Sequence, residues 1–109
     1  MNDFSKTEKK LARALFDLAK KRDYEKLKND INSFQVNTPQ DIWELREFLN
    51  NKAKEFDKKY DYRYSILEEV FSYFIVEDLL KVEELKELST SHQEKIISLV
   101  KNIKNFNRK

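Results

Sequence analysis

Residues 41–67, DIWELREFLNNKAKEFDKKYDYRYSIL, decide the fold of this chain, because they join an amphipathic helix to an aromatic-rich junction. Ile42, Leu45, Leu49 and Phe56 fall at offsets that place them on one side of a helix. Such a stripe needs a partner surface to bury it. The segment therefore predicts a helix that packs against other helices.

Trp43 lies beside this stripe, on a mixed face that also carries Glu47 and Lys54. A large aromatic side chain next to charges is either the rim of a core or an anchor for a binding partner. Helical spacing alone favours the rim, because most Trp residues in proteins are largely buried. The binding anchor stays open as the alternative.

The tyrosines that follow allow two interpretations. Tyr60, Tyr62, Tyr64 and Ile66 alternate as in a strand, whereas Tyr60 and Tyr64 also begin a helical stripe that continues into residues 67–74. The helical pattern is favoured because it extends over four turns. We expect a helix over about residues 62–76, with a kink or break between residues 57 and 61.

The remaining helices are indicated by their first turns. Ser5 with Glu8 forms a capping box that opens a helix of about 25–30 residues, whose apolar face rotates or bends near residues 20–22. Thr38 and Pro39 suit the start of a second helix that ends near Lys58. A short helix is expected over residues 82–88.

A last helix is expected to open with a second capping box, made by Ser91 and Glu94, and to turn Ile96 and Val100 inward. His92, the single histidine, falls in its first turn and is expected to be exposed to solvent. Without an orienting partner and a nucleophile, this histidine predicts no catalysis.

The composition points to one all-helical domain. The chain has 109 residues, one proline, no glycine and no cysteine, so glycine-rich phosphate loops, nucleophile elbows and disulfides are excluded. We expect an all-α fold with a long two-helix arm (about residues 5–59) and a compact C-terminal helical head (about residues 60–105). We expect no enzymatic activity, no cofactor and no metal site, since no cluster of ligating side chains is evident.

Charge argues against nucleic acid and membrane partners. The net charge is only +2, although residues 95–109 carry five basic side chains and no acidic one. Nucleic-acid binding usually needs a strongly basic domain. No apolar run approaches the length of a membrane span and no signal-peptide pattern is present, which predicts a soluble cytoplasmic protein.

Four pieces of the chain resemble the fluorescence recovery protein family. They are D-I-W-x-L-x-E-F-L at residues 41–49, E-F-D-x-K-Y-D-Y-R-Y-S-I-L at residues 55–67, V-F at residues 70–71, and L-L-K-V-E-E-L-K-E-L at residues 79–88. Together they cover roughly residues 35–103. The K-Y-D-Y-R-Y-S core is the most specific piece.

The resemblance implies an elongated helical homodimer that binds the orange carotenoid protein. It would accelerate the return of that protein from its red to its orange form and its release from the phycobilisome. The family's contact surface is associated with a Trp, a His-Asp pair and an Arg. The corresponding positions here are Trp43, then Arg46 and Glu47, then Ala53 with Lys52 before it.

Two further sets of residues are expected to hold the structure together. Ile42, Leu45 and Leu49 are the expected dimer interface. Asp57, Asp61 and Arg63 are expected to join the arm to the head through a partly buried ion pair. The sequence also leaves open a homodimeric interaction module whose partner is not a carotenoid protein.

Overall fold

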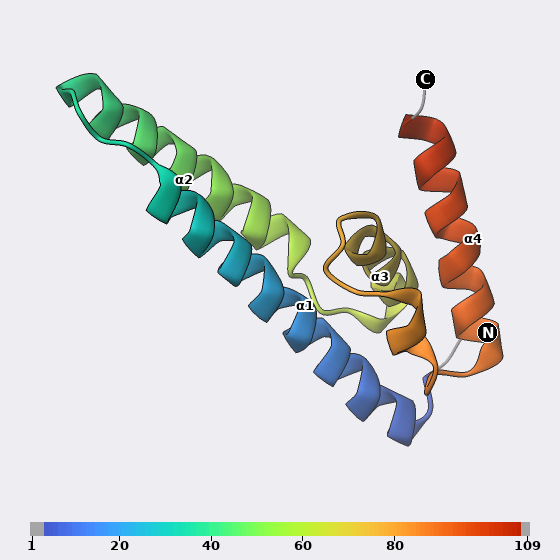
Figure 1. Cartoon of the computed structure of the whole chain (residues 1–109). Coiled ribbons are helices and arrows are strands. Elements are labelled where there is room, and N and C mark those ends of the chain that lie inside the picture. The colour runs from blue at the N-terminus through green and yellow to red at the C-terminus, as the bar shows by residue number, and fades with distance from the viewer. Residues whose placement is uncertain (1–3, 108–109) are drawn as a thin grey trace. The chain divides into compact units, whose positions relative to one another are not determined.

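The computed structural model describes residues 4–107, and all regular structure in them is helical, as the sequence predicts. Figure 1 shows the four α-helices, which are α1 (Lys6–Ser33), α2 (Pro39–Lys59), α3 (Leu67–Val76) and α4 (Thr90–Asn107). Two 3-10 helices, η1 (Tyr64–Ile66) and η2 (Val82–Leu85), precede α3 and α4. Within the described residues, no helix is both long and apolar enough to cross a bilayer.

The starts of α1 and α2 confirm the two capping signals. The Ser5 backbone N–H donates to Glu8 Oε1, and the Glu8 N–H donates to Ser5 Oγ, both at 3.1 Å. At α2, the Asp41 N–H donates to Thr38 Oγ1 at 3.3 Å, and the Thr38 N–H donates to Asp41 Oδ2 at 2.9 Å. Each pair satisfies amides that a helix start otherwise leaves without partners.

The chain divides into two compact units. The head unit contains residues 4–23 and 62–107, and the hairpin unit contains residues 24–61. The first part of α1, which sequence analysis assigns to the arm, therefore groups with the head. The reason is its apolar face: Ala12, Phe16 and Ala19 are buried among residues of the head unit.

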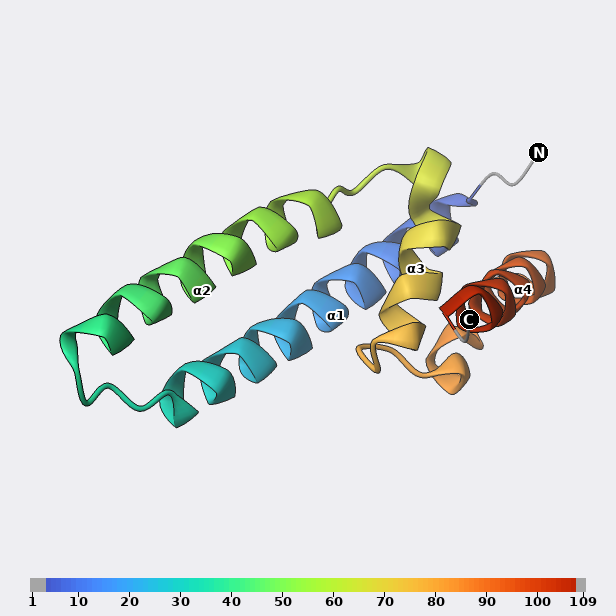
Figure 2. The same ribbon diagram turned by 90° about the horizontal axis from the view of Figure 1, so that it is seen from above.

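The core of the head unit is formed where α3 packs against α4 (Figure 2). Its largest fully buried apolar side chains come from α3, η2, α4 and the loop after α3; they are Leu67, Phe71, Phe74, Leu79, Leu80, Leu85 and Ile96. This is a dense apolar interior for a unit of this size, and it carries most of the hydrophobic stabilisation of the chain.

The loop after α3 turns without a glycine. Asp78 has a positive φ of 63°, a left-handed conformation that glycine usually occupies. The Leu79 N–H donates to the Phe74 carbonyl at 2.7 Å and the Asp78 N–H to the Ile75 carbonyl at 3.1 Å. This is the Schellman arrangement of a helix C-terminus.

The segment before α3 differs from the prediction. The helix begins at Leu67 instead of near residue 62, and the residue at the start of η1, Arg63, is extended with φ −133° and ψ 130°. Tyr62 therefore lies in non-helical backbone, whereas Tyr64 already belongs to the 3-10 helix η1. The predicted break between the helices is present, because residues 60–63 lie outside any helix.

The start of α4 also differs. The helix begins at Thr90, and the His92 N–H donates to Ser89 Oγ at 3.3 Å, so Ser89 rather than Ser91 caps it. The predicted short helix is the single 3-10 turn η2. Ile96 and Val100 are buried, as expected.

In the hairpin unit, the second part of α1 runs beside α2 (Figures 1 and 2). Aromatic pairs join the two helices: the rings of Phe34 and Phe48 lie 6.2 Å apart, and those of Tyr24 and Phe56 lie 4.8 Å apart. Of residues 24–61, all of which the structure describes, only Phe56 is buried. A single copy therefore gives this unit very little core.

Candidate protein-binding surface

The faces of α2 follow from its helical geometry. The less exposed residues Leu45, Phe48, Lys52 and Phe56 share one face. Phe56 contacts Tyr24 of α1, and Phe48 contacts Phe34, the residue directly after α1, so this face is turned toward α1. The opposite face of α2 is then directed away from α1 and is available to another molecule.

Trp43 lies on this outward face. It is 57% exposed, which is unusual for the largest apolar side chain of a protein. The interpretation of Trp43 as the rim of a core is therefore wrong within a single copy. Glu47, one turn further along α2, is exposed beside it.

The other predicted contact residues divide into two groups. Arg46 and Ala53 are exposed on the flank of α2 that adjoins Trp43. Lys52 is nine positions after Trp43, so about 180° around the helix separates the two side chains. Lys52 pairs with Glu55 at 3.3 Å and lies 5.7 Å from the Phe48 ring centroid. The structure thus brings Trp43, Arg46, Glu47 and Ala53 to one side and leaves Lys52 apart.

The predicted dimer residues lie on the flank next to Ala53. Ile42 is 50% exposed and Leu49 is 38% exposed, while Leu45 is half-buried. Ile42, Leu45 and Leu49 follow one another at spacings of three and four residues, so they form a continuous apolar strip. In a single copy, Ile42 and Leu49 of this strip face solvent.

The junction residues are placed as follows. Asp57 and Arg63 are exposed, and Asp61 is half-buried. Asp57 and Asp61 belong to the hairpin unit and Arg63 to the head unit. The exposure of Arg63 removes the burial that a strongly stabilising ion pair was expected to have.

Tyr62 and Tyr64 contact the first part of α1 in this segment. The Tyr62 ring packs 4.9 Å from the Phe16 ring, edge on, and the Arg13 guanidinium lies 4.7 Å from the Tyr62 centroid. The Lys9 ammonium lies 5.1 Å from the Tyr64 centroid. Burial, with the neighbouring Tyr64 hydroxyl, raises the pKa of Tyr62 to about 12. Sequence analysis noticed the aromatic alternation but assigned the attachment to charges.

His92 is the largest surprise among the ionisable residues. It is 2% exposed, not solvent-exposed as predicted. Its Nδ1 lies 2.8 Å from Glu68 Oε2, its Nε2 lies 3.9 Å from Glu8 Oε2, and its ring stacks on Phe4 at 4.0 Å. With Ser89 recognised as the N-cap, His92 becomes the third residue of the helix, and this assignment is the signal that sequence analysis missed.

Two carboxylates anchor distant segments in the head unit. Glu8 Oε2 accepts a 2.8 Å hydrogen bond from the Ser89 N–H, which together with the Ser5 N–H lowers the pKa of Glu8. Arg22 donates to both oxygens of Glu84, at 2.7 and 2.8 Å, and to the Leu79 carbonyl at 2.9 Å. The Arg22 hydrogen bonds lower the pKa of Glu84.

The ionisable contacts described above link segments of the head unit. Among residues 4–107, no group of three or more His, Asp or Glu side chains is placed to hold a metal ion. The chemically prominent groups, His92 and the Arg22–Glu84 pair, hold helices together. The surface around Trp43 combines exposed apolar area with charges of both signs.

Comparison with known proteins gives the same picture. Residues 4–100 match the family described as photoprotection regulator fluorescence recovery protein. The fluorescence recovery protein of Synechocystis sp. is 35% identical over 100 residues, which are 90% of this chain and 92% of that protein.

Two solved structures superimpose on the fold. The fluorescence recovery protein of Fremyella diplosiphon has a TM-score of 0.86 and 38% identity, over 91% of this chain and 99% of that one. That of Synechocystis sp. PCC 6803 has a TM-score of 0.79 and 35% identity, over 84% and 97%.

These similarities place the chain in a class of proteins described as photoprotection regulators. Within that class, the chain belongs to the fluorescence recovery protein family. The resemblance found in residues 35–103 is thereby confirmed, and the match extends it to the first helix.

Proposed function

We propose that this protein is a cytoplasmic homodimer that binds the orange carotenoid protein, accelerates its return from the red to the orange form, and promotes its release from the phycobilisome. Membership of the fluorescence recovery protein family is the observation that carries this proposal. The same membership makes a module with an unrelated partner the weaker alternative.

The dimer is supported by the shortage of core in the hairpin unit. Residues 24–61, which contain the second part of α1 and all of α2, bury a single side chain, Phe56, and leave Ile42 and Leu49 exposed. Apolar area contributes to stability only when it is removed from water, at about 25 cal/mol per Å². A second copy that covers the strip of Ile42, Leu45 and Leu49 would supply the missing burial.

The dimer is tested by placing a charge in this strip. Ile42→Glu is expected to shift the protein from dimer to monomer at micromolar concentration. Burying an uncharged polar group without a hydrogen bond costs about 2–7 kcal/mol, and burying an unpaired carboxylate costs more. Asn51→Glu is the matched control, since Asn51 is exposed and lies about 180° from Ile42 on α2. Sedimentation velocity measures the mass of both variants. A wild-type protein that sediments as a monomer would refute the dimer.

Binding to the carotenoid protein is assigned to the surface of Trp43, Arg46 and Glu47. An exposed aromatic ring flanked by both signs of charge has the composition of a binding hot spot. Ala53 lacks the cation that the resemblance associates with this position. A charge-assisted hydrogen bond contributes about 1.5–3 kcal/mol, so its loss corresponds to about ten- to a hundredfold in affinity.

The proposed activity requires no bond chemistry. A protein partner accelerates a conformational return only if it binds the states along that path more tightly than it binds the starting state. Weaker binding through Ala53 reduces this difference without removing the surface. We therefore expect slow acceleration by the wild-type chain.

The experiment follows the decay of red-form absorbance in darkness with a purified orange carotenoid protein. Ala53→Arg is expected to increase the rate over wild type, and Trp43→Ala is expected to lower it. Asn32→Arg adds the same cation at an exposed position of α1, outside the assigned surface, and is expected to change nothing. If neither wild type nor Ala53→Arg accelerated the decay, the proposed function would be rejected. Equal gains from Ala53→Arg and Asn32→Arg would reject the assigned surface and indicate a general charge effect.

A further inference from the structure

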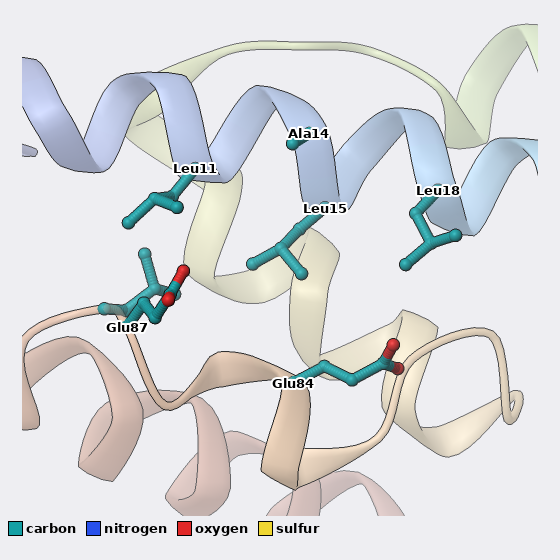
Figure 3. A pocket seen from close by; sticks show the side chains of 7 residues that line it. Leu11, Ala14, Leu15, Leu18, Glu84 and Glu87 are labelled. Atoms are coloured by element: carbon teal, nitrogen blue, oxygen red, sulfur yellow. The ribbon is translucent and has the colours of Figure 1, made fainter.

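A small apolar groove in the head unit has no occupant in a single copy. Figure 3 shows Leu11, Leu15 and Leu18 of α1 directed toward the segment that carries Glu84 and Glu87. Ala14 and Leu88 complete the lining. The three leucines are half-buried, so they form an open apolar floor with carboxylates at its edge.

The size of the groove suits one aromatic ring. Its volume is about 160 Å³. An engineered leucine-lined cavity of about 150 Å³ binds one benzene molecule, so the match in volume and lining is close. The expected guest is a single ring carried by a segment that tolerates carboxylates nearby.

The chain itself presents such a ring. Phe106, near the end of α4, is 78% exposed, the highest value for any large apolar side chain among the described residues. The surrounding sequence, residues 95–109, has five basic side chains and no acidic one. Its charge is thus opposite to that of Glu84 and Glu87.

A chain cannot place Phe106 in its own groove. Leu88 lines the groove just before α4 begins at Thr90. Phe106 lies sixteen residues after Thr90 on the same helix, which places it about 24 Å from Thr90 along the helix axis. The ring must therefore come from another molecule.

We propose that Phe106 of one copy docks in the groove of Leu11, Leu15, Leu18 and Leu88 of a second copy. The contact is head-to-tail, because different residues meet on the two copies. Glu87 meets the basic tail, while Arg22 already engages Glu84. This association uses only the head unit, so it is separate from the dimer assigned to Ile42 and Leu49, and it holds whether or not that dimer forms.

Two variants isolate the two halves of the contact. Ala14→Phe fills the groove from an exposed position of α1 but leaves the tail intact. Phe106→Ala removes the ring but leaves the groove intact. Ala14→Ser and Phe106→Tyr are the matched controls, since they change the same positions without filling the groove or losing the ring. Circular dichroism confirms that each variant is folded.

Sedimentation velocity over micromolar to millimolar concentration measures the association. The wild type and both controls are expected to form species larger than the basal state at high concentration. Ala14→Phe alone and Phe106→Ala alone are each expected to self-associate more weakly than wild type, by about tenfold or more. The reason is that Phe106 can no longer be buried in the groove. A mixture of the two is expected to regain association, since one supplies the tail and the other the groove. Added salt is expected to weaken it.

The mixture of Ala14→Phe with Phe106→Ala is the decisive measurement for the proposed contact. Wild-type association that persists in Phe106→Ala would overturn the proposal, as would a mixture that associates no better than its components. Wild type that stays at its basal mass throughout the concentration range would overturn it as well. Association driven by another surface would leave all four variants equal to wild type.

Discussion

Glu8 serves two helix starts with one carboxylate. Its Oε1 accepts from the Ser5 N–H at α1, and its Oε2 accepts from the Ser89 N–H before α4. These hydrogen bonds favour the charged form and hold the pKa of Glu8 below its ordinary value. The folded protein is therefore more stable where Glu8 is ionised.

This linkage predicts a pH-dependent difference between wild type and Glu8→Gln. A carboxyl whose pKa is lower in the folded state stabilises above its unfolded pKa, about 4.3, and loses that contribution as pH falls through the folded value. The unfolding free energy of wild type, measured in urea, is expected to exceed that of Glu8→Gln most near pH 7. This difference is expected to shrink below about pH 4. A difference in unfolding free energy that stayed constant from pH 7 to below about pH 4 would mean that the charge of Glu8 does not contribute to stability.

The Arg22–Glu84 pair makes a second prediction. Arg22→Lys keeps the charge but loses the fork that donates to both carboxylate oxygens and to the Leu79 carbonyl. We expect a loss of about 1–2 kcal/mol in unfolding free energy. That corresponds to a melting temperature lower by several degrees, at about 4–8 °C per kcal/mol.

Arg46→Lys, at an exposed position of α2, is the control for this change and is expected to melt like wild type. Scanning calorimetry of the two variants measures the difference. Equal melting temperatures would show that the part-exposed pair at Glu84 contributes no more than a surface ion pair.

Among the elements, α3 ends in the most demanding conformation of the chain. Asp78 adopts φ 63° in a protein that contains no glycine. The left-handed conformation raises the free energy of a residue other than glycine by about 1–2 kcal/mol, although Asp adopts it more readily than most residues. The Schellman hydrogen bonds of Leu79 and Asp78 keep this conformation in place.

Asp78→Gly is therefore expected to raise the melting temperature. The gain is expected to be about 0.5–1 kcal/mol, since the greater freedom of glycine in the unfolded chain offsets part of the relief. Glu77→Gly, one residue earlier, has an ordinary negative φ of −89° and is expected to destabilise. Differential scanning fluorimetry compares the two, and a destabilised Asp78→Gly would show that the Asp side chain itself stabilises the turn.

The element boundaries show what sequence can and cannot predict. The starts of α1 and α2 depend on Ser5, Glu8, Thr38 and Asp41, which act within one turn, and both were predicted. The start of α4 depends on Ser89, whose amide is satisfied by Glu8, 81 positions earlier. Such a partner leaves no local pattern, so the cap was placed at Ser91 and His92 was assigned to solvent.

The same limit applies to the candidate surface. The helical spacing of residues 42–56 separates Trp43 from the apolar stripe, which predicts two faces of α2. It does not predict which face meets α1, because that depends on packing with Phe34 and Tyr24. The exposure of Trp43 and the separation of Lys52 from it follow only from the structure.

At the scale of the molecule, the two units differ in how much they bury. Residues 24–61 bury Phe56 alone, whereas the head unit buries long stretches of α3 and α4. Local stability follows buried apolar contact, so the hairpin unit is expected to open more readily than the head. Its protection should then depend on a second copy.

Amide hydrogen exchange tests this difference. Amides of α2 are expected to exchange faster than those of α3, and dilution is expected to accelerate exchange in α2 while leaving α3 unchanged. Ile42→Glu should reproduce the effect of dilution at any concentration. Uniform protection of both helices, independent of concentration, would contradict the unequal burial and the proposed dimer together.

The hydrogen bond between Glu8 and Ser89 also sets an order of events during synthesis. A ribosome releases the chain from its N-terminus, so residues 24–61 are complete and contiguous well before residue 89 emerges. The hairpin unit can pair its helices as it is made. The first turns of α1, in contrast, reach their final contacts only after the last quarter of the chain is made. That part carries the Ser89 amide that donates to Glu8 and the His92 ring of α4 that stacks on Phe4. Stalled nascent chains that end before residue 89 are thus expected to hold a formed hairpin and an unfinished head.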